Sequence, residues 1–335
     1  MDAVIPWVDG NDPAHRERLE SYLRGLGRPR SRNADPTRFD DAGELVYCVA
    51  SIIRYAPWFR QIHIVTDRQT PALMSQLAGT PWAQRVRVVD HREIFADHEQ
   101  HLPTFNSRSI SCMLYRIPDL ARHFVCFNDD FAVLRPIDPA VFFRGDSMVV
   151  RGQWCAQGPH QWHRRIATRL GIGGRARASD AAPNRLAQQF SARLAGFERN
   201  YCRMQHTPYP YRRTTIRDFF AEHPQRLETQ LSHRLRSADQ FLAESLAAHL
   251  EIAHDNAVID NRLRVVQLKP AEQAGWRLRA KLRRADRDPS FAFACVQSLD
   301  LAPPAVRRDV VAWLDRRVGS LDVALAESGK PRAKR

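Results

Sequence analysis

Long apolar runs and the common nucleotide-binding signatures are missing from this chain. No stretch approaches the ~20 consecutive apolar residues that a membrane-spanning helix needs. The opening sequence MDAVIPWVDG has no basic flank before an apolar core, so we expect no signal peptide. Neither GxxxxGKS/T nor a GxGxxG after an expected strand occurs, which argues against P-loop and dinucleotide-binding proteins.

Paired cysteines are missing as well. The six cysteines are scattered and form no CxxC pair, and several lie in apolar runs, where free thiols pack as small hydrophobic side chains. This usage fits a reducing compartment. We therefore expect a cytoplasmic protein that is soluble or peripherally attached to the inner face of the cell membrane.

Negative charge is in short supply, because 51 Lys and Arg residues stand against 37 Asp and Glu residues, for a formal net charge of +14. The surplus predicts anionic partners, such as nucleotide phosphates, polyanionic polymers, an anionic membrane face or nucleic acid. No zinc-finger spacing, RNP-like aromatic strand or contiguous basic recognition helix occurs. Nucleic acid is therefore not expected as a partner.

The first 150 residues alternate between β-favouring apolar runs and helix-like segments. The runs lie at 3–8, 61–67, 86–90 and 124–127, and the helix-like segments at 17–28, 44–55 and 71–77. This alternation predicts an α/β fold with a parallel, Rossmann-like sheet. Polar residues at the strand ends should gather on one edge of that sheet. These are Asp9, Asp67, Asp90, Asp129 and Asp130.

Composition and periodicity divide the remainder of the chain into three further parts. Residues 151–200 look like an insertion rich in loops, with helical periodicity only from 185 to 197. Residues 201–320 are expected to be mainly helical, with one helix running from 231 toward 250, and to complete the active site. The basic end, residues 321–335, is predicted to be disordered, and a second polar loop is expected at 29–38.

The sequence Asn128-Asp129-Asp130 is the strongest candidate site, because it lies between the apolar runs 124–127 and 131–134. Adjacent carboxylates repel each other and are costly to desolvate, so a cation should meet them there. Hard oxygen ligands suit Mg²⁺ or Mn²⁺ carrying a phosphate. A polar turn with an aspartate helix cap explains this stretch alone equally well.

Weaker candidates lie on two other segments. Asp9, Asn11 and Asp12 follow the first strand and could contact a nucleotide, although these residue types are also ordinary in turns. Asn106, Ser107 and Arg116 are candidates for the wall of a substrate pocket.

Several motifs in order resemble successive conserved regions of the Stealth family. They are IPWVDGNDP, RFDDAGELVYCVASIIRYAPWFRQIHIVTD, LPTFNS, HFVCFNDD, QHTPYP and SHRLRSADQ. That family comprises bacterial capsule and exopolysaccharide hexose-1-phosphate transferases and the catalytic subunit of animal N-acetylglucosamine-1-phosphotransferase. The resemblance covers most of residues 1–145 and 200–250, with a weaker region at 289–314. It implies a Rossmann-like, GT-A-like nucleotide-sugar transferase core with helical insertions.

The resemblance also implies an activity. A hexose-1-phosphate or N-acetylhexosamine-1-phosphate would move from a nucleotide sugar, most simply a UDP-sugar, to a hydroxyl of a glycan or polysaccharide acceptor. The products would be a phosphodiester and a nucleoside monophosphate, in capsule or exopolysaccharide synthesis. The alternative is a metal-dependent glycosyltransferase, which would break the sugar–oxygen bond and release a nucleoside diphosphate.

The family's essential groups fall on Asp129 and Asp130, which would hold Mg²⁺ or Mn²⁺, and on His206 and Arg236, with Asn128 beside the substrate. A histidine with a pKa near neutrality suits a general base, and a guanidinium suits phosphoryl oxygens. On residue type alone, a histidine such as His206 is more often a loop residue hydrogen-bonded to the backbone, and an arginine such as Arg236 is more often part of a solvated, basic helix start. Departures from the family pattern bear on substrate identity and metal dependence, and occur at Arg68, Ser111, Tyr115, Gln297 and Ser298.

Overall fold

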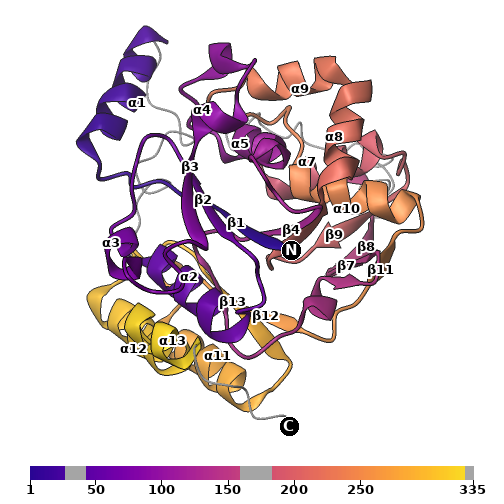
Figure 1. Ribbon diagram of the computed structural model, residues 1–335. Helices are drawn as coiled ribbons and strands as arrows, with labels where there is room; N and C mark the ends of the chain where they lie inside the picture. The colour runs from indigo at the N-terminus through magenta and orange to yellow at the C-terminus, as the bar shows by residue number, and fades with distance from the viewer. Residues whose placement is uncertain (27–42, 159–182, 329–335) are drawn as a thin grey trace.

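The computed structural model describes residues 1–26, 43–158 and 183–328 (Figure 1). The loop expected at 29–38, part of the 151–200 insertion and residues 329–335 of the basic end lie outside this description. The prediction that 321–328 are disordered is wrong, because these residues form helix α13 (Leu321–Ser328), which buries Leu321 and Ala324. One hydrophobic core extends through the described chain, from Ala3 to Ala324. No described helix is both long and apolar enough to cross a membrane.

The central sheet has the strand order β10-β4-β1-β2-β3. Its strands are β1 (Asp2–Pro6), β2 (Ile62–Thr66), β3 (Val86–Asp90), β4 (His123–Cys126) and β10 (Tyr209–Arg212). The first four run parallel, and β10 pairs antiparallel with β4. The order β3-β2-β1-β4 matches the first four strands of the Rossmann order 3-2-1-4-5-6, so the expected α/β, Rossmann-like core is confirmed.

Helices cover both faces of this sheet, which explains why its inner strands are largely buried and rich in apolar residues. In Figure 1, α4, α5, α8 and α9 lie on the upper side, and α2, α3, α11, α12 and α13 on the lower side. All five residues of β2 are buried, as expected for a strand covered on both faces. Helix α2 (Glu44–Tyr55) turns Leu45, Val49 and Ile52 into the core at the predicted spacing.

The remaining helices have the following bounds: α1 (Pro13–Gly25), α3 (Leu73–Leu77), α4 (His91–Ile94), α5 (Ser107–Met113), α7 (Asn184–Leu194), α8 (Arg213–Glu222), α9 (Pro224–Leu231), α10 (Ala243–Ala253), α11 (Gly275–Arg287), α12 (Pro304–Arg317) and α13 (Leu321–Ser328). Short 3-10 turns are η3 (Glu99–His101), η4 (Leu114–Arg116) and η5 (Pro139–Val141).

The chain leaves the central sheet at the acidic pair and enters a second sheet. There β5 (Phe131–Val133) pairs antiparallel with β13 (Phe291–Val296), which pairs parallel with β12 (Arg264–Leu268). Asn128, Asp129 and Asp130 therefore span the junction between the two sheets. A third sheet consists of β6 (Phe143–Arg144), β7 (Ser147–Val150) and β11 (Ala257–Ile259).

Part of the expected loop-rich insertion is a strand. β8 (Gly152–Ala156) pairs antiparallel with β9 (Asn200–Met204). The approach is close at Gly152, where a Cβ would lie 2.6 Å from Cys202 Sγ and 2.9 Å from the Arg203 carbonyl oxygen. This strand was missed because Gln153 and Trp154 are exposed and its sequence, GQWCA, carries no clear alternation of apolar and polar residues.

The helix predicted from 231 toward 250 is wrong in its first half. Helix α9 ends at Leu231, and α10 begins only at Ala243. The backbone between them is held open by side chains from α5: Asn106 Nδ2 donates to the His233 carbonyl oxygen at 2.6 Å, and Arg108 Nη1 to that of Ser237 at 2.9 Å. These distant contacts override local helical preference.

Candidate active site

A cavity of about 560 Å³ opens at the carboxyl ends of β1, β2 and β4. Its opposite wall comes from the residues before β10 and from the segment between α9 and α10. The lining includes seven of the residues singled out from the sequence: Asp67, Ser107, Asn128, Asp129, Asp130, His206 and Arg236. Ser111, Gln297 and Ser298, three of the departures from the family pattern, line it too.

The carboxylate of Asp130 has an incomplete set of hydrogen bonds. Its Oδ2 accepts from Cys295 Sγ at 3.4 Å, whereas its Oδ1 is shielded from solvent and forms no hydrogen bond with any described residue. Burial raises the pKa of Asp130 to about 7, and the nearby Glu44 carboxylate adds to the rise. A group in this state either takes up a proton or binds a cation.

Further carboxylates also line the cavity and add to the need for a proton or a cation there. Glu44 begins α2, and Glu244 lies in the first turn of α10. Burial raises the pKa of Glu244, while the positive charges of Arg108 and Arg236 oppose that rise. Of these four residues, only Arg236 was singled out from the sequence. Glu44 lies inside the RFDDAGELVYCVASIIRYAPWFRQIHIVTD motif and Arg108 directly follows LPTFNS, so the charged residues in and beside each motif were the signal that could have found them.

His206 faces the same cavity from the other side. Its Nδ1 lies 2.7 Å from Tyr209 Oη, and the edge of its ring packs against Phe131. Burial lowers the pKa of His206, and the positive charges of Arg236 and Lys269 lower it further. The imidazole is therefore neutral near pH 7. When Nδ1 carries the hydrogen and donates it to Tyr209 Oη, the Nε2 lone pair is left to accept a proton.

Strand pairing fixes how the acidic pair and His206 approach each other. Tyr209, at the start of β10, pairs with Cys126, at the end of β4. Because the two strands are antiparallel, the residues just before β10 meet the residues just after β4. These are His206 and Asn128 to Asp130.

Arg236 is positioned by α5. Its Nη2 and Nε donate to Ser107 Oγ at 2.6 and 3.2 Å. Asn106, the N-cap of α5, is fully buried and donates to the His233 carbonyl oxygen and to Gln240 Oε1. The expectation that Asn106 lines the pocket is therefore corrected, since its amide holds the segment that carries Arg236.

Arg116 also lies away from the cavity. Its Nη2 donates to the Ala96 carbonyl oxygen at 2.6 Å and to Asp97 Oδ2 at 3.2 Å. The turn η4, which follows α5, directs this side chain toward the 96–97 loop. Arg116 and Tyr115 line a separate surface depression instead.

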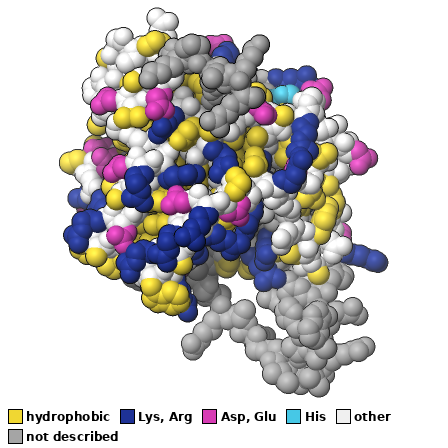
Figure 2. Space-filling view, turned by 90° about the horizontal axis from the view of Figure 1, so that it is seen from below, with side chains coloured by type: hydrophobic (Ala, Val, Ile, Leu, Met, Phe, Trp, Pro, Cys, Tyr) yellow, Lys and Arg dark blue, Asp and Glu magenta, His cyan; other side chains and the backbone are white. Residues whose placement is uncertain are grey.

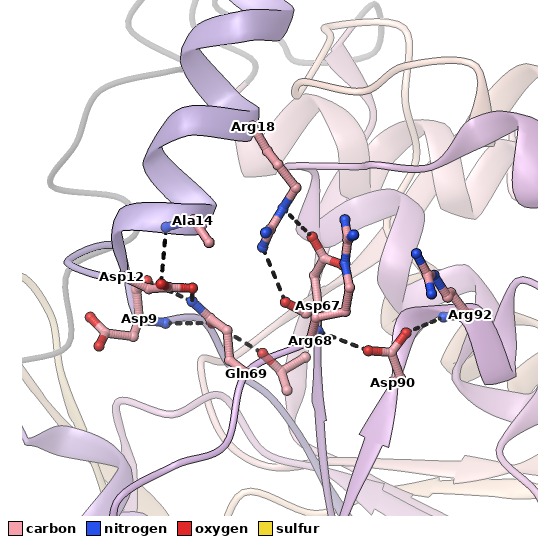
Figure 3. Close-up of polar contacts among 10 residues, drawn as sticks. Asp9, Asp12, Ala14, Arg18, Asp67, Arg68, Gln69, Asp90 and Arg92 are labelled. Carbon is pink, nitrogen blue, oxygen red and sulfur yellow. Dashed lines mark hydrogen bonds and ion pairs between the residues drawn. The ribbon is translucent and has the colours of Figure 1, made fainter.

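Three residues expected to contact a nucleotide instead build a turn and a helix cap; Figure 3 draws two of them, Asp9 and Asp12. Asp9 Oδ1 accepts from the Asn11 backbone N–H at 2.8 Å. Asp12 is the N-cap of α1, accepting from Ala14 N at 3.1 Å and from Gln69 Nε2 at 2.9 Å. Asp9, Asn11 and Asp12 do not line the cavity, because their oxygens face these local donors.

The carboxylates after β2 and at the end of β3 are satisfied in the same way (Figure 3). Asp67 forms ion pairs with Arg18 at 3.0 Å and with Arg68 at 3.1 Å. Asp90 caps α4 in a capping box and accepts from the Arg68 and Arg92 backbone N–H groups.

Two family models match the chain. Residues 1–27 match the model of Stealth protein conserved region 1, and residues 38–150 that of conserved region 2. The chain carries two conserved regions of the Stealth family. Conserved region 2 contains Asp129, Asp130 and Ser107, whereas His206 and Arg236 lie beyond both Stealth regions.

Two relatives of these Stealth regions come from bacteria. The chain is 33% identical over 293 residues to exopolysaccharide phosphotransferase SCO6023 of Streptomyces coelicolor, a match that covers 86% of the chain and 46% of that protein. It is 40% identical over 150 residues to capsular polysaccharide phosphotransferase LcbA of Aeromonas hydrophila, covering 44% of the chain and 39% of that protein. The matches therefore span less than half the length of these relatives.

Among solved structures, the galactosyltransferase LgtC aligns with 99% of the chain and 98% of its own, at 12% identity and a TM-score of 0.41. This likeness is too distant to bear on the reaction.

Proposed function

We propose that this protein transfers a hexose-1-phosphate or N-acetylhexosamine-1-phosphate from a nucleotide sugar to a glycan hydroxyl during capsule or exopolysaccharide synthesis. One observation carries the proposal: a single cavity sets the unsatisfied carboxylate of Asp130 opposite His206 and Arg236. The names of the relatives, capsular and exopolysaccharide phosphotransferases, support the same reaction class.

Asp129 and Asp130 would hold a divalent ion, Mg²⁺ or Mn²⁺. The fit rests on the shielded Oδ1 of Asp130, on its raised pKa and on the hard oxygen character of both side chains. When bound, such an ion would neutralise phosphate charge.

Residues of the chain would accept the proton and bind the phosphoryl oxygens. The acceptor hydroxyl oxygen attacks the β-phosphorus of the donor, and the bond from that phosphorus to the oxygen bridging it to the α-phosphorus breaks. His206 Nε2 takes the hydroxyl proton, with Tyr209 holding the ring by its Nδ1. Arg236, held by Ser107, places its planar fork against the phosphoryl oxygens. The nucleoside monophosphate leaves, and the sugar–oxygen bond survives.

The product decides between this reaction and sugar transfer by a metal-dependent glycosyltransferase. The purified protein is incubated with a panel of nucleotide sugars, UDP-sugars first, and with glycan acceptors, and nucleotides are separated by chromatography. The proposal requires a nucleoside monophosphate and phosphorus in the glycan product. Stoichiometric release of a nucleoside diphosphate would establish the glycosyltransferase reaction instead.

We further propose that the protein contacts an anionic membrane surface through its basic face. Figure 2 shows Lys and Arg side chains gathered across the side on which α11, α12 and α13 lie in Figure 1. Helix α11 buries Leu278, Leu282 and Ala285. Its outer side carries several arginines, and Trp276 at its start is 62% exposed. Basic residues beside an exposed tryptophan suit an anionic bilayer interface.

Co-sedimentation with lipid vesicles tests this contact. Binding to vesicles that contain phosphatidylglycerol should exceed binding to pure phosphatidylcholine vesicles and should fall as salt rises. The double variant Arg283→Glu, Arg287→Glu should lose binding, whereas Arg24→Glu on α1 should not. Equal binding to both kinds of vesicle, or an unchanged double variant, would contradict the proposal.

A further inference from the structure

Two histidines and a glutamate converge at a place that the proposed reaction does not use. His98 Nδ1 lies 2.8 Å from Glu228 Oε1, and His101 Nε2 lies 2.8 Å from Glu228 Oε2. The potential ligand atoms of all three side chains lie within 4.8 Å of one another. His98 precedes η3, His101 ends it, and Glu228 projects from α9. None of the three lines the cavity.

These side chains have the chemistry of a transition-metal site. Two imidazole nitrogens and one carboxylate oxygen form a ligand set that Zn²⁺ accepts, with water in the fourth position. The imidazoles of His98 and His101 are largely shielded, at 18% and 13% exposure, whereas Glu228 is 46% exposed. The ligands are therefore held in place on one side and open to an arriving ion on the other.

We propose that His98, His101 and Glu228 bind one divalent transition-metal ion, with Zn²⁺ the best match to the ligand types. The competing arrangement is a glutamate that accepts one hydrogen bond from each imidazole. That arrangement already brings the three ligands together from two separate segments, so binding needs only a small opening of the two 2.8 Å contacts. Because a metal site and a hydrogen-bonded triad would place the three side chains alike, measurement of bound metal decides between them.

A bound ion would join the two segments that position Arg236. Beyond the cluster, Arg234 Nη2 donates to the Gln100 carbonyl oxygen at 2.9 Å, and Phe105 N donates to the Arg234 carbonyl oxygen at 2.9 Å. These contacts join residues 98–107 to residues 228–236, and the contact between Arg236 and Ser107 lies at the far end of both segments. The ion would thus fix the outer end of this pairing, and His98, His101 and Glu228 would be positioning residues. This consequence rests on the proposed function, whereas metal binding itself does not.

Metal content of the full, untagged chain tests the proposal independently of activity. The protein is stripped with a chelator, dialysed against Zn²⁺ and then against metal-free buffer, and analysed by inductively coupled plasma mass spectrometry. The wild type should retain a single zinc ion per chain. His98→Ala and His101→Ala should weaken zinc binding by more than the ~10- to 100-fold that loss of an outer-shell partner costs.

Two control variants separate this site from others. His254→Ala removes an exposed histidine elsewhere and should leave zinc retention unchanged. Asp130→Asn removes the cavity carboxylate and should also retain zinc, so failure of the proposed reaction would leave this result intact.

Thermal unfolding guards against variants that fail to fold. Zinc should raise the Tm of the wild type and of both controls, but not that of Glu228→Gln, which keeps a hydrogen-bond acceptor in place. A wild type that retains no zinc, or variants that retain it as well as the wild type does, would leave the cluster as a hydrogen-bonded triad and overturn the proposal.

Discussion

The carboxylates at the edge of the central sheet divide into two regions that look alike in sequence and differ in structure. Asp12, Asp67 and Asp90 each face backbone N–H groups or cationic side chains of their own neighbourhood. Asp130 has a thiol on one oxygen and no described hydrogen-bond partner on the other. A carboxylate at a strand end thus marks a candidate site when its partners are missing, because a satisfied carboxylate has already been used to stabilise the fold.

Replacing Asp130 should give the largest effect and tests the unsatisfied half of this comparison. Asp130→Asn keeps the size of the side chain but removes the charge that would hold a divalent ion. We expect turnover to fall by on the order of 1,000-fold, a loss at the upper end for one charge-stabilising group. Steady-state release of nucleoside monophosphate measures it. Retention of near wild-type turnover, or full wild-type activity in EDTA, would remove Asp130 from metal binding.

The histidine across the cavity should come next. His206→Ala removes the proposed proton acceptor, a group typically worth ~100- to 10,000-fold in rate, so turnover should fall far more than donor affinity. Calorimetry with the donor provides the second measurement. If the variant no longer bound donor, or if its turnover at saturating substrate matched the wild type, His206 would have to be assigned a structural role.

Arg236→Lys should have a smaller but still large effect. The charge is kept, but the planar fork that reaches Ser107 and the phosphoryl oxygens is lost. We expect a loss in turnover below the ~100- to 1,000-fold cost of removing a charge-stabilising donor entirely. Ser107→Ala, measured alongside, tests whether the orientation of the fork contributes. Equal rates for Lys and Arg at this position would show that charge alone suffices.

How much of this the sequence could predict depends on the distance over which each contact acts. The parallel strands and the acidic pair were predictable, because each rests on a run of a few adjacent residues. The role of Asn106 was not, because its amide bonds to a carbonyl 127 residues away. The contact of His206 with Tyr209 is local in sequence, yet it forms only because β10 joins the central sheet beside β4.

The stability of the protein without metal should depend on pH in a way that isolates Asp130. Its pKa in the folded state, about 7, lies above the ordinary value of 3.8. The folded protein therefore binds this proton more tightly, and the stability that Asp130 contributes is lost as pH rises through about 7. In metal-free buffer the Tm of Asp130→Asn should exceed that of the wild type by a few degrees at about pH 8, and by less at about pH 5. A Tm difference that does not change with pH would contradict the unsatisfied state of Asp130.

The smallest effect should come from the satisfied carboxylates. Asp12→Ala removes the N-cap of α1, and such losses typically cost ~1 kcal/mol of unfolding free energy. Chemical denaturation should show this loss, while the KM for the donor stays unchanged. A raised KM with unchanged stability would restore the interpretation of Asp12 as a nucleotide contact.

The antiparallel pairing of β4 with β10 also bears on how such an enzyme can diversify. The pairing of Tyr209 with Cys126 sets the separation between the base and the acidic pair, whatever the length of chain that connects the two strands. Segments between them can therefore be lengthened, shortened or exchanged while the reacting groups keep their spacing. Under the proposed function, changes in the chain between β4 and β10 would alter the surroundings of the cavity without moving His206 away from Asp129 and Asp130.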